Sequence, residues 1–170
     1  MAKWVIIARI SAAAMAAAIA AVPATAATVT AQVTAKVVKP LALTALQDMQ
    51  FGSMLLGPGN WTGENVVISQ AGVRTCPADV VCSGSALPAR FNVTGTNNNT
   101  ATITVPNVTM VNLADSTKTL TLVPNAPASV AITNSGAPGY NFSVGGSIAL
   151  SSTTADGDYA GTLTVTVDYQ

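Results

Sequence analysis

Apolar and polar residues alternate with a period of two along most of the chain after Ala27, which predicts β-strands. Thr, Val and Ile dominate these stretches, as expected for side chains on a pleated, half-buried surface. Pro and Gly between the runs indicate turns and argue against long helices. Many short strands separated by turns predict an all-β sandwich or barrel.

The interior of the chain holds several such runs. We expect strands at residues 41–44, 65–69, 89–94, 100–105, 118–123, 129–133 and 147–151. The composition of residues 56–60 predicts a turn, and residues 48–52 are expected to form a loop that enters the next element. Gly95-Thr96-Asn97-Asn98-Asn99 predicts a hairpin loop between the runs that flank it.

The last run has the most regular alternation. One face carries Tyr159, Gly161, Leu163, Val165, Val167 and Tyr169, and the other carries Thr162, Thr164, Thr166 and Asp168. Chain ends normally fray, yet this pattern continues to the penultimate residue. We therefore expect residues 159–169 to be paired along their whole length.

The first run, residues 28–37, has an apolar face of small side chains. These are Val29, Ala31, Val33, Ala35 and Val37. Lys39-Pro40 then breaks the pattern and could act as a hinge. An isolated strand cannot satisfy its own backbone or bury its own face. The run therefore pairs either within its own domain or with a neighbouring subunit by β-strand addition; the pattern leaves both open.

Residues 1–26 have the pattern of a cleaved secretory signal peptide. Lys3 and Arg9 begin it, the apolar stretch 10–22 follows, and small residues occupy positions −3 and −1 of a cut before Ala27. A retained membrane anchor is the alternative, but the Ala-rich stretch is short and weakly apolar for the about 20 residues that a span needs. We expect an exported chain without membrane insertion after cleavage.

Composition excludes several classes of function. Loss of Lys3 and Arg9 with the signal takes the seven basic residues to five, against seven acidic ones, so no nucleic-acid partner is expected. The chain has no His, which removes the commonest general base and metal ligand and makes a Ser-His-Asp triad impossible. We predict no enzymatic activity, no cofactor and no metal site.

Cys76 and Cys82 bracket five residues, and such a pair in an oxidising compartment predicts a disulfide. A loop this short stabilises the fold by only about 2 kcal/mol. A redox pair would need closer spacing, and two cysteines without His cannot complete a tetrahedral zinc site.

Two other features have both a functional and a structural interpretation. Asp156 and Asp158 flank Gly157 and could ligate calcium, but two carboxylates in a turn are more often solvated turn formers. Trp61 could stack on a sugar, as in an adhesin, or it could be a buried aromatic plug beneath a loop.

The mature chain resembles bacterial pilin domains of the chaperone–usher type, in particular an uncharacterised pilin-like family of exported Gram-negative proteins. The matching stretches are residues 40–52, 89–95 with 100–106, and 144–169. The last is the most specific, because a Gly, an aromatic residue, alternating apolar residues and a penultimate Tyr recur in pilin C-termini. Donor strands of pilins usually carry bulkier residues than Ala31 and Ala35, and a glycine that this run lacks.

The resemblance implies an incomplete immunoglobulin-like β-sandwich that is completed by a strand from a neighbouring subunit. A periplasmic chaperone would first lend a strand, and an outer-membrane usher would replace it with the N-terminal extension of the next subunit. The donor face would be Val29, Ala31, Val33, Ala35 and Val37. The C-terminal assembly strand would present Tyr159, Leu163, Val165, Val167 and Tyr169.

The expected organisation is a signal peptide (1–26), a donor-strand extension (27–39) and a pilin-like sandwich (40–170). We expect a fimbrial (pilus) shaft subunit that forms a homopolymer at the cell surface and serves adhesion. The alternative is a secreted coat or matrix protein with a self-complete sandwich. A tip adhesin would normally need a further binding domain.

Overall fold

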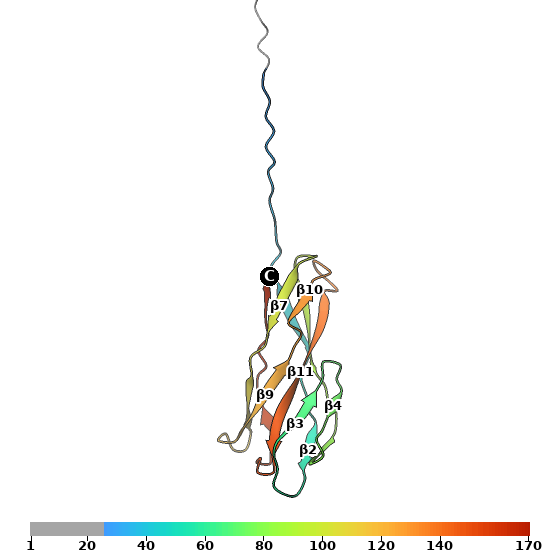
Figure 1. Cartoon of the computed structure of the whole chain (residues 1–170), viewed down its shortest axis with the longest axis vertical. Coiled ribbons are helices and arrows are strands. Elements are labelled where there is room, and N and C mark those ends of the chain that lie inside the picture. Colours follow the sequence, from blue (N-terminus) through green and yellow to red (C-terminus); the bar gives the residue numbers. More distant parts are fainter. Residues whose placement is uncertain (1–25) are drawn as a thin grey trace, which may run out of the picture. The chain divides into compact units, whose positions relative to one another are not determined.

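The computed structural model describes residues 26–170, and the signal peptide expected at 1–26 lies outside them except for its last residue. The chain divides into two units, residues 1–35 and residues 36–170. In the described part every regular element is a β-strand (Figure 1). The strands are β1 (Ala42–Gln47), β2 (Ser53–Leu56), β3 (Thr62–Ile68), β4 (Arg74–Thr75), β5 (Val80–Ser83), β6 (Ala89–Thr94), β7 (Thr100–Thr104), β8 (Val108–Asn112), β9 (Thr119–Asn125), β10 (Ser129–Ala131), β11 (Tyr140–Ser151), β12 (Tyr159–Ala160) and β13 (Thr166–Tyr169). Among these residues no helix is long and apolar enough to cross a membrane.

All strand pairs are antiparallel. The main sheet has the order β1-β6-β11-β9-β8-β12, and β3 joins it at β11 with β4 at its side. A second sheet has the order β10-β7-β13, and β2 pairs with β5 in a separate two-stranded sheet. The predicted all-β sandwich is confirmed.

The core consists of two clusters that share β11. The first cluster lies between β6 and β11 of the main sheet and β7 of the second sheet, and it contains the stacked rings of Phe91 and Phe142, whose centroids are 5.5 Å apart. The second cluster is built from β3, β9 and the far half of β11, and includes Val66, Ile68 and Ile148. Because the twelve residues of β11 run through both clusters, one strand ties the two halves of the domain together.

One expectation about local structure is wrong. The loop 95–99 does not close a hairpin, because β6 pairs with β1 and β11 whereas β7 pairs with β10 and β13. The loop carries the chain from one sheet to the other, and its turn-forming residues suit either path. Residues 26–41 carry no strand, and Val29, Val33 and Val37 are 93%, 91% and 88% exposed, so the run 28–37 does not pair within its own domain; pairing with a neighbouring subunit stays a prediction.

Candidate assembly groove

One rim of a groove in the domain is formed where β1 ends. Gln47 closes β1 and donates from its side-chain amide to the carbonyl of Pro88 at 2.7 Å. Three residues later Gln50 exchanges two backbone hydrogen bonds with Leu87, each 2.8 Å long, in an isolated bridge. Between these anchors Asp48 and Met49 belong to no strand, so this rim is held at both ends.

The opposite rim is the C-terminal segment, and here the prediction of a strand paired along its whole length is wrong. β12 pairs with β8 in the main sheet, and β13 pairs with β7 in the second sheet. In the described structure the intervening residues, 161–165, make no backbone hydrogen bond to another part of the backbone. The segment crosses from one sheet to the other, and the five central residues are left without a hydrogen-bonded partner strand.

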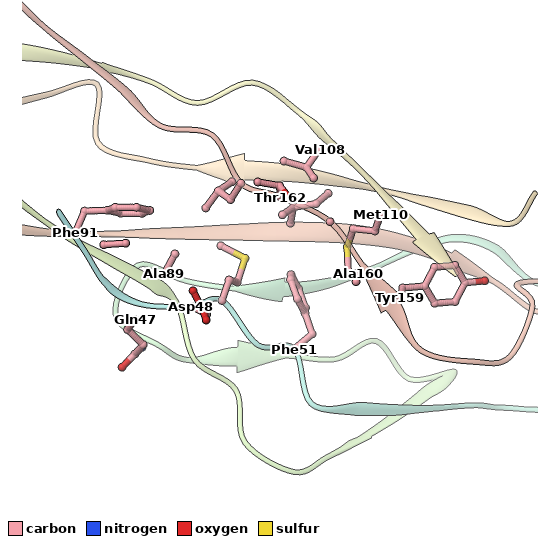
Figure 2. Close-up of a pocket in the computed structure, with 15 residues that line it drawn as sticks. Gln47, Asp48, Phe51, Ala89, Phe91, Val108, Met110, Tyr159, Ala160 and Thr162 are labelled. Carbon is pink, nitrogen blue, oxygen red and sulfur yellow. The ribbon is translucent and has the colours of Figure 1, made fainter. Parts of the chain in front are cut away.

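A groove of about 510 Å³ lies between the two rims. One rim contributes Gln47, Asp48, Met49 and Phe51 to its lining, and the other contributes residues 159–163. Beneath them lie residues that include Ala89, Phe91, Val108 and Leu122. Figure 2 shows the side chains of Phe51, Phe91 and Met110 projecting into the space between the rims. An apolar floor thus lies beside a stretch of unpaired backbone.

The groove continues into a second hollow of about 710 Å³. Met49, Phe51, Met110 and Tyr159 line both parts. The second part extends along β2 and past Leu120, Ile148 and Leu150 to the turn at 154–158. Its apolar lining is rich in Met and Leu, side chains that adapt their shape to what they contact.

A family model matches residues 41–169, which covers most of the chain and the whole groove. The chain belongs to the family described as a domain of unknown function, DUF4402. Comparisons with curated proteins and with solved structures found no match. The DUF4402 match therefore shows the family of the domain without assigning it an activity.

The DUF4402 domain brings only part of the predicted assembly strand into the groove. Tyr159 and Leu163 line it. Val165, Val167 and Tyr169 instead pack against the first core cluster, as does Leu163 from its own position. The predicted donor residues Ala31 and Ala35 are exposed, like the three valines of the same face.

The opposing rim of the DUF4402 groove was not anticipated from the sequence. Met49 and Phe51 are spaced by two, which was a signal that both face the same side. The residues lay in a stretch interpreted as a loop, so their shared face was not assigned to a site. Met110 on β8 was missed because no strand was expected there.

At the end of the DUF4402 domain, the Tyr169 hydroxyl joins two distant loops. It donates to the carbonyl of Lys39 at 2.6 Å and accepts from the backbone N–H of Thr96 at 2.6 Å. The backbone N–H of Lys39 in turn donates to the Thr96 hydroxyl at 2.6 Å. Both backbone polar groups of Lys39 are therefore bonded, one residue before Pro40.

The predicted disulfide is confirmed. Cys76 and Cys82 are bonded, with their Cα atoms 6.3 Å apart, and both pack against the second core cluster. Cys82 lies on β5 opposite Met54 of β2, so the bond braces the small sheet that borders the second part of the groove.

The Asp156-Gly157-Asp158 turn and Trp61, each of which had two interpretations, both make contacts within the fold. The carbonyl of Asp156 accepts from the Asn112 side-chain amide at 2.8 Å, and in the described residues no three potential metal-binding side chains gather. The half-buried Trp61 packs against the second cluster and donates from Nε1 to the carbonyl of Gly57 at 3.2 Å.

Proposed function

We propose that the chain is a structural subunit of a surface fimbria, and that it polymerises when its N-terminal extension enters the groove of the next subunit. The observation that carries this proposal is the unpaired backbone of residues 161–165 beside an apolar groove. An inserted strand would supply hydrogen-bond partners to that backbone and apolar side chains to the floor. This is β-strand addition, in which the backbone gives affinity and alternate side chains give specificity.

The extension has the complementary properties. It alternates apolar and polar residues over 28–37, and its valines are almost fully exposed in the isolated chain. Burial of three valines at about 1.5–3 kcal/mol each gives an upper bound of roughly 5–9 kcal/mol. Ladder hydrogen bonds add about 0.5–1.5 kcal/mol each. Together these terms are sufficient to hold subunits in a durable polymer.

Charge also favours this occupant. The carboxylates that line the two parts of the groove are Asp48, Asp156 and Asp158, and no basic side chain lines either part. The charged residues of the extension are Lys36 and Lys39. The opposite signs favour docking of the extension over an acidic segment, with a contribution that falls as salt rises.

Assembly by this route needs further partners, which the resemblance to chaperone–usher pilins supplies. A periplasmic chaperone would cover the groove before assembly and prevent aggregation through its unpaired edge. An outer-membrane usher would then exchange the chaperone strand for the extension of the next subunit. The proposed location is the cell surface, after export through the periplasm.

Electron microscopy of the purified chain, combined with SDS gels of boiled and unboiled samples, tests the proposal. We expect thin filaments, and SDS-resistant ladders that collapse to monomer on boiling. Removal of residues 28–38 is expected to abolish both and to leave a monomer. Monomer in every lane for the intact chain would favour a secreted coat or matrix protein that completes its own sandwich. Polymers that persist without residues 28–38 would contradict strand exchange.

A further inference from the structure

The hydrogen bonds around Tyr169 fix the point where the N-terminal extension leaves the domain. We propose that Tyr169 and Thr96 form a latch on Lys39 that keeps the extension from folding back into its own groove and so leaves it free for a neighbour. This inference rests on the proposed function, and it assigns a positioning role to a hydroxyl far from the groove itself. The latch is defined as the Tyr169 hydroxyl, the Thr96 hydroxyl and backbone N–H, and the Lys39 backbone.

Insertion of the extension into its own groove competes with insertion into the groove of a neighbour, because the groove is close in sequence to the extension. Its first lining residue, Ala45, follows Lys39 by only a few positions. A local segment at high effective concentration would normally outcompete a second molecule for such a groove. To reach it, the chain would have to reverse its direction near Lys39 and run back beside β1. A polymer-forming subunit therefore needs a feature that disfavours this reversal.

Lys39 is held in a conformation that does not reverse the chain. Pro40 disfavours the helical region for the residue that precedes it and so favours an extended Lys39. The latch then bonds both backbone groups of Lys39, its N–H to Thr96 Oγ1 and its carbonyl to Tyr169 Oη. The Lys39 ammonium also donates to the carbonyl of Ser135 at 3.3 Å. Reversal at this residue would break these bonds together.

The domain makes room for the latch at Gly95. A Cβ at Gly95 would lie 2.5 Å from Tyr169 Oη and 2.8 Å from Leu41 Cδ2, so any larger residue would displace the hydroxyl. The ring of Tyr169 packs against the first core cluster, while its hydroxyl reaches past that cluster to Lys39. Position 169 thus combines a packing role, which Phe can fill, with a bonding role, which Phe cannot.

The latch is the point at which the C-terminal segment meets the extension. Residues 161–163 line the groove, and Tyr169 of the same segment holds the residue from which the extension departs. The site that receives a neighbour's strand and the site that releases the chain's own strand are therefore joined by a single segment. Loss of the latch should raise the fraction of chains whose extension lies in its own groove, with little change in the packing of the core.

Tyr169→Phe in the full chain tests the inference, with Tyr140→Phe as the matched control. In the described structure the hydroxyl of Tyr140 makes no hydrogen bond to protein, and its side chain is 38% exposed. Thr96→Val is the second variant, because it removes the acceptor of the Lys39 N–H without altering the Tyr169 ring. For each protein we would measure the rate of SDS-resistant ladder formation, binding of a synthetic peptide of residues 28–38, and amide exchange at position 96.

We expect both variants to stay folded in the absence of urea and to form ladders more slowly than wild type, by about fivefold for Thr96→Val, which loses one hydrogen bond, and by more for Tyr169→Phe, which loses two. Peptide binding should weaken similarly, since the groove is now filled from within, and Thr96 amide exchange should speed up in Tyr169→Phe. Tyr140→Phe should match wild type in all three. If Tyr169→Phe does not fold, the same measurements on Thr96→Val decide the test.

The possible failures are distinguishable. Ladder rates and peptide binding equal to wild type in both variants would overturn the latch and leave the proposed function intact. Faster ladder formation in the variants than in wild type would do the same. A wild-type chain that neither forms ladders nor binds the peptide would overturn the proposed function, and the latch with it.

Discussion

The guanidinium of Arg74 donates from Nη1 to the carbonyl oxygen of Phe51 at 2.7 Å, and the same nitrogen donates to the carbonyl of Ser83 at 2.9 Å. Arg74 lies on β4, Phe51 forms part of the groove rim, and Ser83 ends the disulfide-braced strand β5. Gly52 permits this approach, because a Cβ there would lie 2.5 Å from Arg74 Nη1. A single cation thus fixes the rim of the groove to the small sheet beside it.

Arg74→Met should therefore destabilise the domain by about 1–3 kcal/mol, because two carbonyl groups lose a charged donor. Arg90→Met is the control: Arg90 is an exposed residue of β6 whose side chain makes no hydrogen bond in the described structure. The free energy of unfolding from urea titrations measures the difference. Equal stabilities of the two variants would show that the Arg74 bonds contribute nothing net.

Gly145 on β11 is packed directly against the backbone of the segment that follows β3. A Cβ at this position would overlap the carbonyl oxygen of Ile68 and lie 2.8 Å from the carbonyl carbon of Ser69. Gly145→Ala should cost about 1–3 kcal/mol, since backbone atoms cannot rotate away. Gly136→Ala, at a loop position with open space around it, should change stability by no more than about 0.5 kcal/mol. A thermal melt of Gly145→Ala that matches Gly136→Ala would contradict this packing.

The sequence predicted the fold best where alternation was uninterrupted. The strand expected at 89–94 coincides with β6, and the expected turn after Leu56 follows β2. The first half of β11 was missed, because the expected strand began only at residue 147, after Gly145-Gly146. Gly145 is approached closely by the backbone at the end of β3 and Gly146 by residues of β9, which is a tertiary requirement that local patterns do not reveal.

The groove could be predicted only in part for a similar reason. A period of two shows which side chains share a face, so Tyr159 and Leu163 were placed on one face, and both line the groove. It does not show which sheet lies opposite, so Met49 and Phe51 were not placed across from them. Nor does it show where a strand changes its partner, which is why the unpaired stretch 161–165 was unexpected.

Asp115 offers a test of local electrostatics in the loop after β8. Its carboxylate accepts from the Thr117 hydroxyl at 2.7 Å and from the Thr117 backbone N–H at 3.0 Å. These bonds, the hydroxyl foremost, lower the pKa of Asp115 below its ordinary value. A carboxylate with a lowered folded-state pKa stabilises the fold above its unfolded pKa, and this contribution disappears as pH falls through the folded value.

Thr117→Val should therefore raise the pKa of Asp115 towards its ordinary value, whereas Thr117→Ser, which retains a hydroxyl, should keep it low. Titration of the Asp115 carboxyl by NMR measures the shift directly. An unchanged Asp115 pKa in Thr117→Val would mean that the Thr117 hydroxyl does not lower it, and that the backbone N–H of Thr117 and the charge of Lys118 do.

A substitution at Val33 can affect assembly without affecting folding, because its side chain is 91% exposed in the isolated chain. Val33→Asp should leave the free energy of unfolding of the monomer within about 0.5 kcal/mol of wild type. In a filled groove the same change would lose the burial of a valine, about 1.5–3 kcal/mol, which corresponds to roughly 10- to 150-fold weaker binding. The added carboxylate would face the acidic lining of the groove, and the repulsion between them would weaken binding further.

Thr34→Asp is the matched control for Val33→Asp, because it adds the same charge on the opposite face of the extension. Peptides of residues 28–38 with each substitution can be titrated against the wild-type chain, and ladders can be followed with each substitution in the full chain. We expect Val33→Asp to reduce both peptide binding and ladder formation by at least about tenfold relative to Thr34→Asp. Equal effects of the two would show that charge alone governs the interaction, and the apolar face of the extension would then not be the surface that enters the groove.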